Sequence, residues 1–222
     1  MKSERLKLGE DFMVAGHRSI GQTRKDGKRL YEIHPFAVRD RLLTVTDDED
    51  MQLIALFHDL EEDVETSDKR RNLNPQEIAY FGLNPNITWR FNILTIAALF
   101  GDRVAIGVEY LTDEFTSKSY PEFNRKTRKQ MQREKYVFMP DNEKVIKLCD
   151  ICENLSDDGG EFSDSFGGPD VGFNIMYIKE KALCLPFLEV KDDPRNAQLY
   201  KLAWEVWHKQ AVKFGVRQCG VR

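Results

Sequence analysis

The sequence predicts an all-α protein, a helical bundle with a short extended or hairpin segment after its first helix. Two observations favour this class. Apolar residues recur at helical spacing along most of the chain, and the polar stretches between them are bounded by glycine or proline. With 222 residues, 41% hydrophobic and 11% aromatic, the chain is long and apolar enough to bury a full core. We interpret residues 1–222 as one domain.

Three helices are expected before residue 65. The first spans Leu8–Ser19, with Phe12 and Ala15 facing inward, and the polar stretch 21–27 after it is a loop with extended pieces out to Tyr31. Pro35 suits the first turn of the second helix. The buried face of that helix is expected to consist of Phe36, Val38, Leu42 and Leu43.

Asp47 or Asp48 caps the third helix, because a carboxylate can accept the free N–H groups of a first turn. The inward residues of this helix are expected to be Met51, Ile54, Ala55, Phe57 and His58. Residues 65–90 are charged or turn-forming and lack apolar periodicity, so they indicate an insertion holding one short helix. An apolar helix over Trp89–Phe100 ends at Gly101, and Val104–Leu111 continues the core.

The second half of the chain contains four more predicted helices. Glu122–Phe138 is strongly basic and is expected to face solvent for most of its length. Asn142–Leu155 follows, and residues 156–170, rich in Ser, Asp and Gly, are interpreted as a mobile surface loop. Two closing helices occupy 173–214, over Phe173–Leu188 and Pro194–Phe214. In Asn142–Leu155 the inward residues are expected to be Val145, Ile146, Leu148 and Ile151.

Composition excludes several classes of protein. The 33 basic and 37 acidic residues give a net charge of −4, which argues against a nucleic-acid partner. The apolar runs are too short to span a bilayer, and the N-terminus lacks a secretion signal, so we expect a cytoplasmic protein without a membrane partner. Cys149 and Cys152 form a single C-x-x-C, which could bind zinc or act in redox chemistry. Without a second such pair, two small buried thiols in a reducing compartment are favoured.

Four side chains could bind one metal ion: His34, His58, Asp59 and Asp150. Taken singly, His34 could cap a helix and His58 could be a satisfied core histidine. Asp59 and Asp150 change that interpretation, because each lies in an apolar helical stretch where a carboxylate is costly unless it is paired or metal-bound. Mixed imidazole and carboxylate ligands suit manganese, iron or zinc.

Further residues could act on a substrate beside that ion. Glu62 and Asp63 lie one turn after His58-Asp59 and could accept a proton from water, although acidic runs usually mark a solvated helix end. Arg24 and Lys25, in a glycine-flanked loop, could contact phosphates or remain in solvent. Asn154, four residues after Asp150 and on the same helix face, could contact substrate or cap the helix end.

These residues resemble the hydrolase half of RelA/SpoT homologues. The resemblance rests on residues 21–27, Tyr31-Glu-Ile-His-Pro35, His58-Asp-Leu-Glu-Glu-Asp63, Phe100–Val104 with Leu111-Thr112, and Lys147-Leu-Cys-Asp150 with Asn154. That half is an HD-superfamily domain that uses manganese to remove the 3′-pyrophosphate of the stringent-response alarmone (p)ppGpp. The likeness extends from Phe12 to Leu155, with 65–90 as an insertion, and it implies a stand-alone small alarmone hydrolase.

The resemblance also implies roles for individual residues. His34, His58, Asp59 and Asp150 would be the metal ligands, and Glu62 and Asp63 would position and activate water. Arg24, Lys25 and Asn154 would bind a small nucleotide substrate, guanosine- or adenosine-based.

The chain departs from the family pattern at Ile151 and Glu153, where arginine and histidine are usual. An acidic Glu153 facing a polyphosphate would repel it. An HD phosphohydrolase acting on other nucleoside mono- or triphosphates is therefore one alternative, and an inactive nucleotide-binding regulator is another. The oligomeric state is not evident from the sequence.

Overall fold

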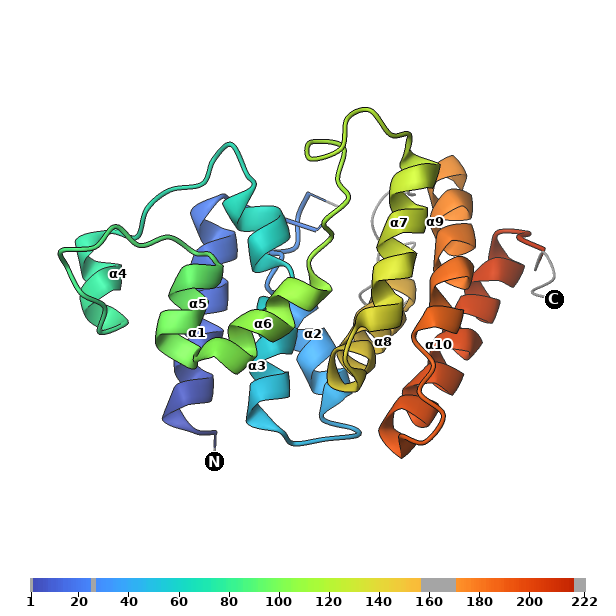
Figure 1. Cartoon of the computed structure of the whole chain (residues 1–222), viewed down its shortest axis with the longest axis horizontal. Helices are drawn as coiled ribbons and strands as arrows, with labels where there is room; N and C mark the ends of the chain where they lie inside the picture. The colour runs from blue at the N-terminus through green and yellow to red at the C-terminus, as the bar shows by residue number, and fades with distance from the viewer. Residues whose placement is uncertain (1, 25–26, 157–170, 218–222) are drawn as a thin grey trace. The chain divides into compact units, whose positions relative to one another are not determined.

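The computed structural model describes residues 2–24, 27–156 and 171–217 (Figure 1). Within them the regular secondary structure is helical, and two isolated antiparallel bridges, Thr23–Leu30 and Asn72–Arg90, supply the extended pairing. The all-α prediction is confirmed. The chain divides into two compact units, residues 1–112 and 113–222, which are described separately below.

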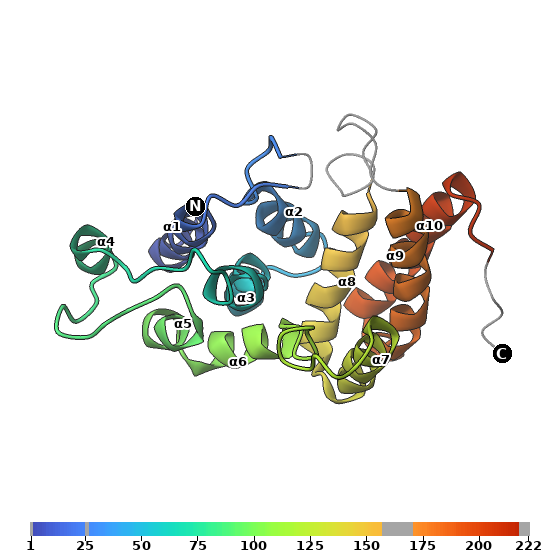
Figure 2. The same cartoon turned by 90° about the horizontal axis from the view of Figure 1, so that it is seen from above.

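The first unit has α3 (Glu49–Phe57) at its centre. α1 (Glu4–Ser19) and α2 (Ile33–Leu42) contact it on one side and α6 (Asp102–Leu111) on the other, with α5 (Ile93–Phe100) packed on α6 (Figure 2). α3 can be central because every residue from Met51 to Phe57 is buried. Asp48 caps its start, its carboxylate accepting the N–H of Met51 at 2.8 Å, as one of the two expected caps.

Aromatic rings fill the core of this unit around Phe12 of α1. Its ring centroid lies 5.8 Å from Phe57, 5.3 Å from Phe81, 5.1 Å from Phe91 and 6.0 Å from Phe100. α1 approaches α3 closely because Gly9 faces Leu53, where an added Cβ would lie 2.3 Å from Leu53 Cδ2. The inward face of α1 therefore includes glycines, while the predicted Ala15 is only half-buried.

The hairpin between α1 and α2 confirms the predicted extended segment. The Arg24 N–H donates to the Arg29 carbonyl at 2.9 Å beside the Thr23–Leu30 bridge. Gly21 and Gly27, which bound the loop, have φ of 65° and 67°, values that favour glycine. The predicted buried face of α2 needs two corrections, the first being that Phe36 is only half-buried. Leu43 lies just beyond the helix end and is 46% exposed, because the last helical residue, Leu42, completes the buried stripe.

The insertion contains α4 (Pro75–Tyr80), the short helix predicted there. Asn74 and Glu77 cap its start reciprocally, and Pro75 occupies the first turn. The segment returns to the core through the buried Phe81 and through the Leu73 N–H, which donates to the Trp89 carbonyl at 2.8 Å. α5 starts later than expected, at Ile93, because Asn92 caps it.

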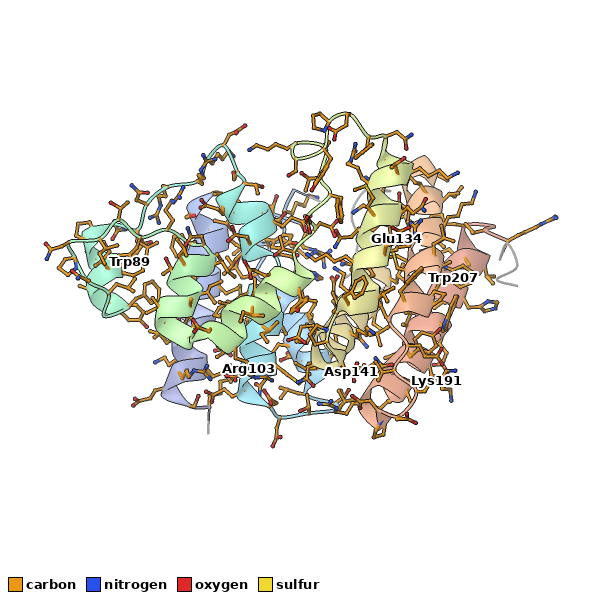
Figure 3. The ribbon with its side chains drawn as sticks, in the orientation of Figure 1. Trp89, Arg103, Glu134, Asp141, Lys191 and Trp207 are labelled. Carbon is orange, nitrogen blue, oxygen red and sulfur yellow. The ribbon has the colours of Figure 1, made fainter. Side chains whose placement is uncertain are left out.

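The second unit is built on α8 (Asp141–Leu155) and α10 (Pro194–Lys213), with α9 (Val171–Cys184) packed on α10 and α7 (Arg125–Lys135) contacting α9. Trp207 of α10 joins the last two long helices, its indole N–H donating to the Ile178 carbonyl at 2.8 Å (Figure 3). The residues of α8 predicted to face inward are all buried. Cys149 and Cys152 are also buried and are free thiols, as the helical-core interpretation expects.

The basic helix α7 faces solvent for most of its length, as expected, and Gln132 is its one buried residue. Arg125 makes two contacts with Glu180 of α9, at 2.8 and 2.9 Å, and Lys129 pairs with Asp113. These ion pairs neutralise two of the basic side chains, although both remain partly exposed to solvent. The loop predicted at 156–170 lies, apart from Ser156, outside the described residues. In the described part of the chain, every helix is too short or too polar to cross a membrane.

Candidate metal and active site

His34, His58 and Asp59 converge in the first unit. One ligand atom from each lies within 4.8 Å of the others. The Oδ2 atom of Asp59 is 3.0 Å from His58 Nε2 and 3.6 Å from His34 Nε2, and both imidazoles are buried. Two neutral nitrogens and one anionic oxygen at this spacing are a donor set that suits a divalent transition metal. Three of the four predicted ligands are thus brought together.

Local structure explains the convergence. His34 lies in the first turn of α2, directly after the hairpin. His58 follows the last residue of α3, and Asp59 precedes a single π-helical turn, Leu60–Glu65. Isolated π turns are rare and occur often at functional sites, because they redirect side chains without ending the helical path. The change of helix type lets two consecutive residues, His58 and Asp59, face the same point.

The orientation of His58 matches that of a metal ligand. Its Nδ1 lies 2.8 Å from the carbonyl oxygen of Ala55, so Nδ1 carries the proton and donates it. The other ring nitrogen, Nε2, lies 3.0 Å from Asp59 Oδ2. Ligating histidines usually donate their second ring N–H to a carbonyl or carboxylate in this way. The side chains present therefore fit a bound divalent ion.

Tyr31, which precedes His34 in the chain, contacts the Asp59 carboxylate. Its hydroxyl donates to Asp59 Oδ2 at 2.6 Å. Its ring packs between two imidazoles, 4.8 Å from that of His17 and 5.8 Å from that of His34. Burial, together with the Asp59 and Asp63 carboxylates, holds the pKa of Tyr31 well above its usual value. The phenol consequently stays a hydrogen-bond donor.

A second set of contacts holds Asp63. Its Oδ2 accepts a hydrogen bond from Gln22 Nε2 at 2.7 Å, and Gln22 Oε1 lies 2.7 Å from Nδ1 of the fully buried His17. Burial, followed by the charge of Asp59, raises the pKa of Asp63 to about 6. Burial lowers the pKa of His17 to about 4, so this imidazole is neutral at physiological pH.

The acidic run does not form a solvated helix end. Glu61 is half-buried and its Oε2 accepts the N–H of Ile93 at 2.8 Å, so it helps to cap α5. Glu62 is also half-buried, and its backbone carbonyl accepts the hydroxyl of Thr66. The catalytic role predicted for Glu62 and Asp63 stays a prediction.

Arg24, one of the two predicted phosphate contacts, belongs to the same neighbourhood. It is buried and its guanidinium lies 5.6 Å from the centre of the Tyr31 ring. Its neighbour in the chain, Lys25, lies outside the described residues. The roles predicted for both remain predictions.

Asp150 and Asn154 belong to the second unit, on α8. Asp150 is buried, with Oδ2 2.9 Å from Lys147 Nζ and Oδ1 accepting from Asn154 Nδ2 at 2.6 Å. Burial opposes the charge of Lys147, but the neighbouring Asp150 raises the pKa of that amine well above its usual value. The roles of Asp150 as fourth ligand and of Asn154 as substrate contact stay predictions from the resemblance.

Sequence reasoning missed His17, Gln22 and Tyr31 as parts of the site. Gln22 and Tyr31 lie inside the stretches that carry the resemblance, but neither received a role. His17 could have been detected, because it lies four residues after Met13 and therefore on the inward face of α1. An imidazole on a buried helix face needs a polar partner.

Comparison with known proteins supports the fold. No protein-family model matches the chain, and no curated protein matches it by sequence. The solved structure of a metazoan ortholog of SpoT aligns with a TM-score of 0.66 and 20% identity, over 96% of this chain and 98% of that one. That protein is described as hydrolysing ppGpp and playing a role in starvation responses. At this identity the likeness shows the fold, so this chain shares the all-helical architecture of that protein.

Proposed function

We propose that this protein is a metal-dependent phosphohydrolase that removes the 3′-pyrophosphate of a guanosine or adenosine alarmone, (p)ppGpp or ppApp. The products would be pyrophosphate and the parent nucleotide. The observation that carries the proposal is the convergence of His34, His58 and Asp59, with Asp63 linked to Asp59 through the Tyr31 hydroxyl. The shared fold with a ppGpp-hydrolysing protein supports the same reaction.

In this proposal His34, His58 and Asp59, with Asp150 as the fourth ligand, bind the divalent ion. Manganese is the metal that the family resemblance implies. When bound, such an ion lowers the pKa of water from about 15.7 towards neutrality and offsets charge on phosphoryl oxygens. The chain's own acidic residues complete the chemistry. Glu62 and Asp63 would take the proton from the attacking water and orient it towards the phosphorus attached to the ribose 3′ oxygen.

The remaining residues would bind the substrate. Arg24 and Lys25 would offset the negative charge of the phosphates, because guanidinium and ammonium groups form strong charge-assisted hydrogen bonds with them. Arg24 is held over Tyr31, close to the ligand group, which places a cation at the side of the site where the hairpin lies. Asn154 would donate to a sugar or phosphate oxygen.

The direct test is incubation of purified protein and Mn²⁺ with ppGpp, ppApp, GTP and dGMP, followed by anion-exchange separation of the products. The proposal expects pyrophosphate release from ppGpp or ppApp alone. Hydrolysis of GTP or dGMP instead would assign the chain to the broader class of HD nucleotide phosphohydrolases. Binding of ppGpp without any product would indicate a regulator. Ile151 and Glu153, which replace the family's usual arginine and histidine, are the reason to include all four nucleotides.

Two variants separate metal binding from catalysis. Asp59→Ala should abolish both Mn²⁺ binding and hydrolysis, because it removes the anionic ligand. Glu62→Gln should bind Mn²⁺ like the wild type but lose about 10²- to 10⁴-fold in kcat, the usual contribution of a general base. Full activity of Glu62→Gln would show that its assigned role is wrong. Metal affinity is measured by titration calorimetry and turnover by pyrophosphate release.

A further inference from the structure

Two residues at the base of the hairpin contact the two carboxylates of the site. Gln22 and Tyr31 flank the Thr23–Leu30 bridge on opposite strands, and the N–H of Tyr31 donates to the carbonyl of Gln22 at 3.4 Å. Asp59 and Asp63 lie one helical turn apart, with the N–H of Asp63 donating to the carbonyl of Asp59 at 2.8 Å. Gln22 contacts Asp63, whereas the Tyr31 hydroxyl donates to Asp59 and also interacts with Asp63.

We propose that Tyr31 and Gln22 are positioning residues, Tyr31 for the metal ligand Asp59 and Gln22 for the water-activating Asp63. The inference rests on the proposed function for the role of Asp63, whereas the role of Tyr31 needs only that the site binds a metal. Neither residue touches the reacting atoms in this assignment. Each acts through the carboxylate it holds.

The geometry of Tyr31 supports its half of the assignment. Its hydroxyl donates to Oδ2 of Asp59, the same oxygen that lies 3.0 Å from His58 Nε2 and 3.6 Å from His34 Nε2. One donated hydrogen bond to that oxygen fixes the rotation of the carboxylate towards the two imidazoles. Because the ring packs between His17 and His34, the hydroxyl cannot easily turn away. Partners of this kind typically change metal affinity about 10- to 100-fold.

Gln22 bridges His17 and Asp63. Its Oε1 accepts from His17 Nδ1, and its Nε2 donates to Asp63, both at 2.7 Å. Turning the amide over would set its oxygen against the Asp63 carboxylate, and that contact would be repulsive. His17 is fully buried on α1 and has little freedom to move. Its contact with Gln22 therefore restrains the amide that donates to Asp63.

The test compares Tyr31→Phe and Gln22→Met with matched controls. Tyr80→Phe removes a hydroxyl that donates to Asp11 at 2.5 Å on the exposed insertion, and Gln130→Met removes an exposed amide that contacts Glu134 at 3.0 Å. Mn²⁺ affinity is measured by calorimetry without nucleotide, and kcat and KM by pyrophosphate release at saturating Mn²⁺. Thermal unfolding in chelator establishes that each variant is folded. If Gln22→Met does not fold, Gln22→Glu is used in its place, because its carboxylate still accepts from His17.

The two variants are expected to fail in different ways. Tyr31→Phe should bind Mn²⁺ about 10- to 100-fold more weakly and recover most of its kcat at saturating metal. Gln22→Met should bind Mn²⁺ within about twofold of wild type and keep its KM, but lose about 10- to 100-fold in kcat, as misplacement of a catalytic group does. The controls should match wild type in all three quantities.

Other outcomes overturn the inference. Unchanged Mn²⁺ affinity in Tyr31→Phe refutes the assignment of Tyr31, and unchanged kcat in Gln22→Met refutes that of Gln22. If the wild type hydrolyses no alarmone, the proposed function fails and the assignment of Gln22 fails with it. The Mn²⁺ affinities of Tyr31→Phe and Tyr80→Phe still decide the assignment of Tyr31, so the two failures are distinguishable.

Discussion

His58 shows how a single backbone contact determines what a side chain can do. Its sequence context, between Phe57 and Leu60, is equally consistent with a core histidine. The 2.8 Å contact of Nδ1 with the Ala55 carbonyl assigns the ring proton to that nitrogen and leaves Nε2 facing Asp59. The imidazole is therefore buried and satisfied on one side, and available as a ligand on the other.

At the same scale, His17 and Asp63 make opposite contributions to stability in acid. The folded-state pKa of His17 is about 4 against an ordinary 6.5, so between these values the unfolded chain binds more protons and stability falls as pH falls. The folded-state pKa of Asp63 is about 6 against 3.8, so the folded chain binds more protons and stability rises as pH falls. In the metal-free protein the two contributions largely cancel between pH 6 and 4.

Removing the contribution of His17 should make the pH dependence due to Asp63 measurable. Relative to wild type, His17→Gln should gain stability as pH falls from 6.5 to 4.5, by about 1 kcal/mol per pH unit, whatever its stability at neutral pH. Urea unfolding in chelator at pH 6.5, 5.5 and 4.5 measures the difference. The exposed His208 supplies the control, since His208→Gln should give a curve parallel to wild type. Parallel curves for His17→Gln as well would contradict the assignment.

At the scale of elements, the site depends on how closely α1 approaches α3 and the π turn that follows it. Gly9 and Gly16 make the approach possible, because an added Cβ would lie 2.3 Å from Leu53 Cδ2 and 2.7 Å from Leu60 Cδ2 respectively. The same face of α1 carries His17, one residue after Gly16. The small residues therefore bring the imidazole close enough to contact Gln22 and to lie beside Tyr31.

A substitution at Gly9 tests this packing. Gly9→Ala improves helix propensity by about 1 kcal/mol, but overpacking in a filled core costs about 1–3 kcal/mol. We expect a net loss of stability, because Leu53 is fully buried and has little room to move. A double-mutant cycle with Leu53→Ala, measured by urea unfolding, provides the control. The penalty of Gly9→Ala should vanish in that background, and strictly additive effects would rule out the contact as its cause.

At the scale of the whole molecule, the proposed ligand set draws on residues more than a hundred positions apart. The first unit supplies His34, His58 and Asp59. The family resemblance adds Asp150, which within its own unit pairs with Lys147 and Asn154. A structural ion pair and a metal ligand predict different consequences when the carboxylate is neutralised, which makes Asp150 the most informative single position.

Asp150→Asn separates the two interpretations. If Asp150 is a ligand, the variant should bind Mn²⁺ at least about 10-fold more weakly, since an anionic donor is replaced by a neutral one. If it only pairs with Lys147, Mn²⁺ affinity should be unchanged, while stability falls by about 3–5 kcal/mol because a buried cation loses its partner. Calorimetry and urea unfolding distinguish the outcomes. Asp193→Asn, at the partly buried Asp193–Arg195 pair of the same unit, controls for the loss of a pair alone.

The sequence determined the class of fold and the identity of most site candidates. Helical periodicity, the Asp48 cap and the Pro75 start are local signals, and local signals persist whatever the rest of the chain does. The His58-Asp59 pair was recognisable because a carboxylate is costly in an apolar stretch. Leu43 was wrongly predicted to be buried. Periodicity predicts a face but not the residue at which the helix ends.

Only the tertiary structure decided which side chains meet. The hydrogen bond from Tyr31 to Asp59 and the His17–Gln22–Asp63 contacts join α1, the hairpin and the π turn, and no spacing in the sequence encodes them. The ion pairs of α7 with Glu180 and Asp113 could not be predicted either, because the sequence of a basic helix does not reveal whether acidic residues lie opposite it. Contacts between distant segments depend on packing, and packing is a property of the folded chain.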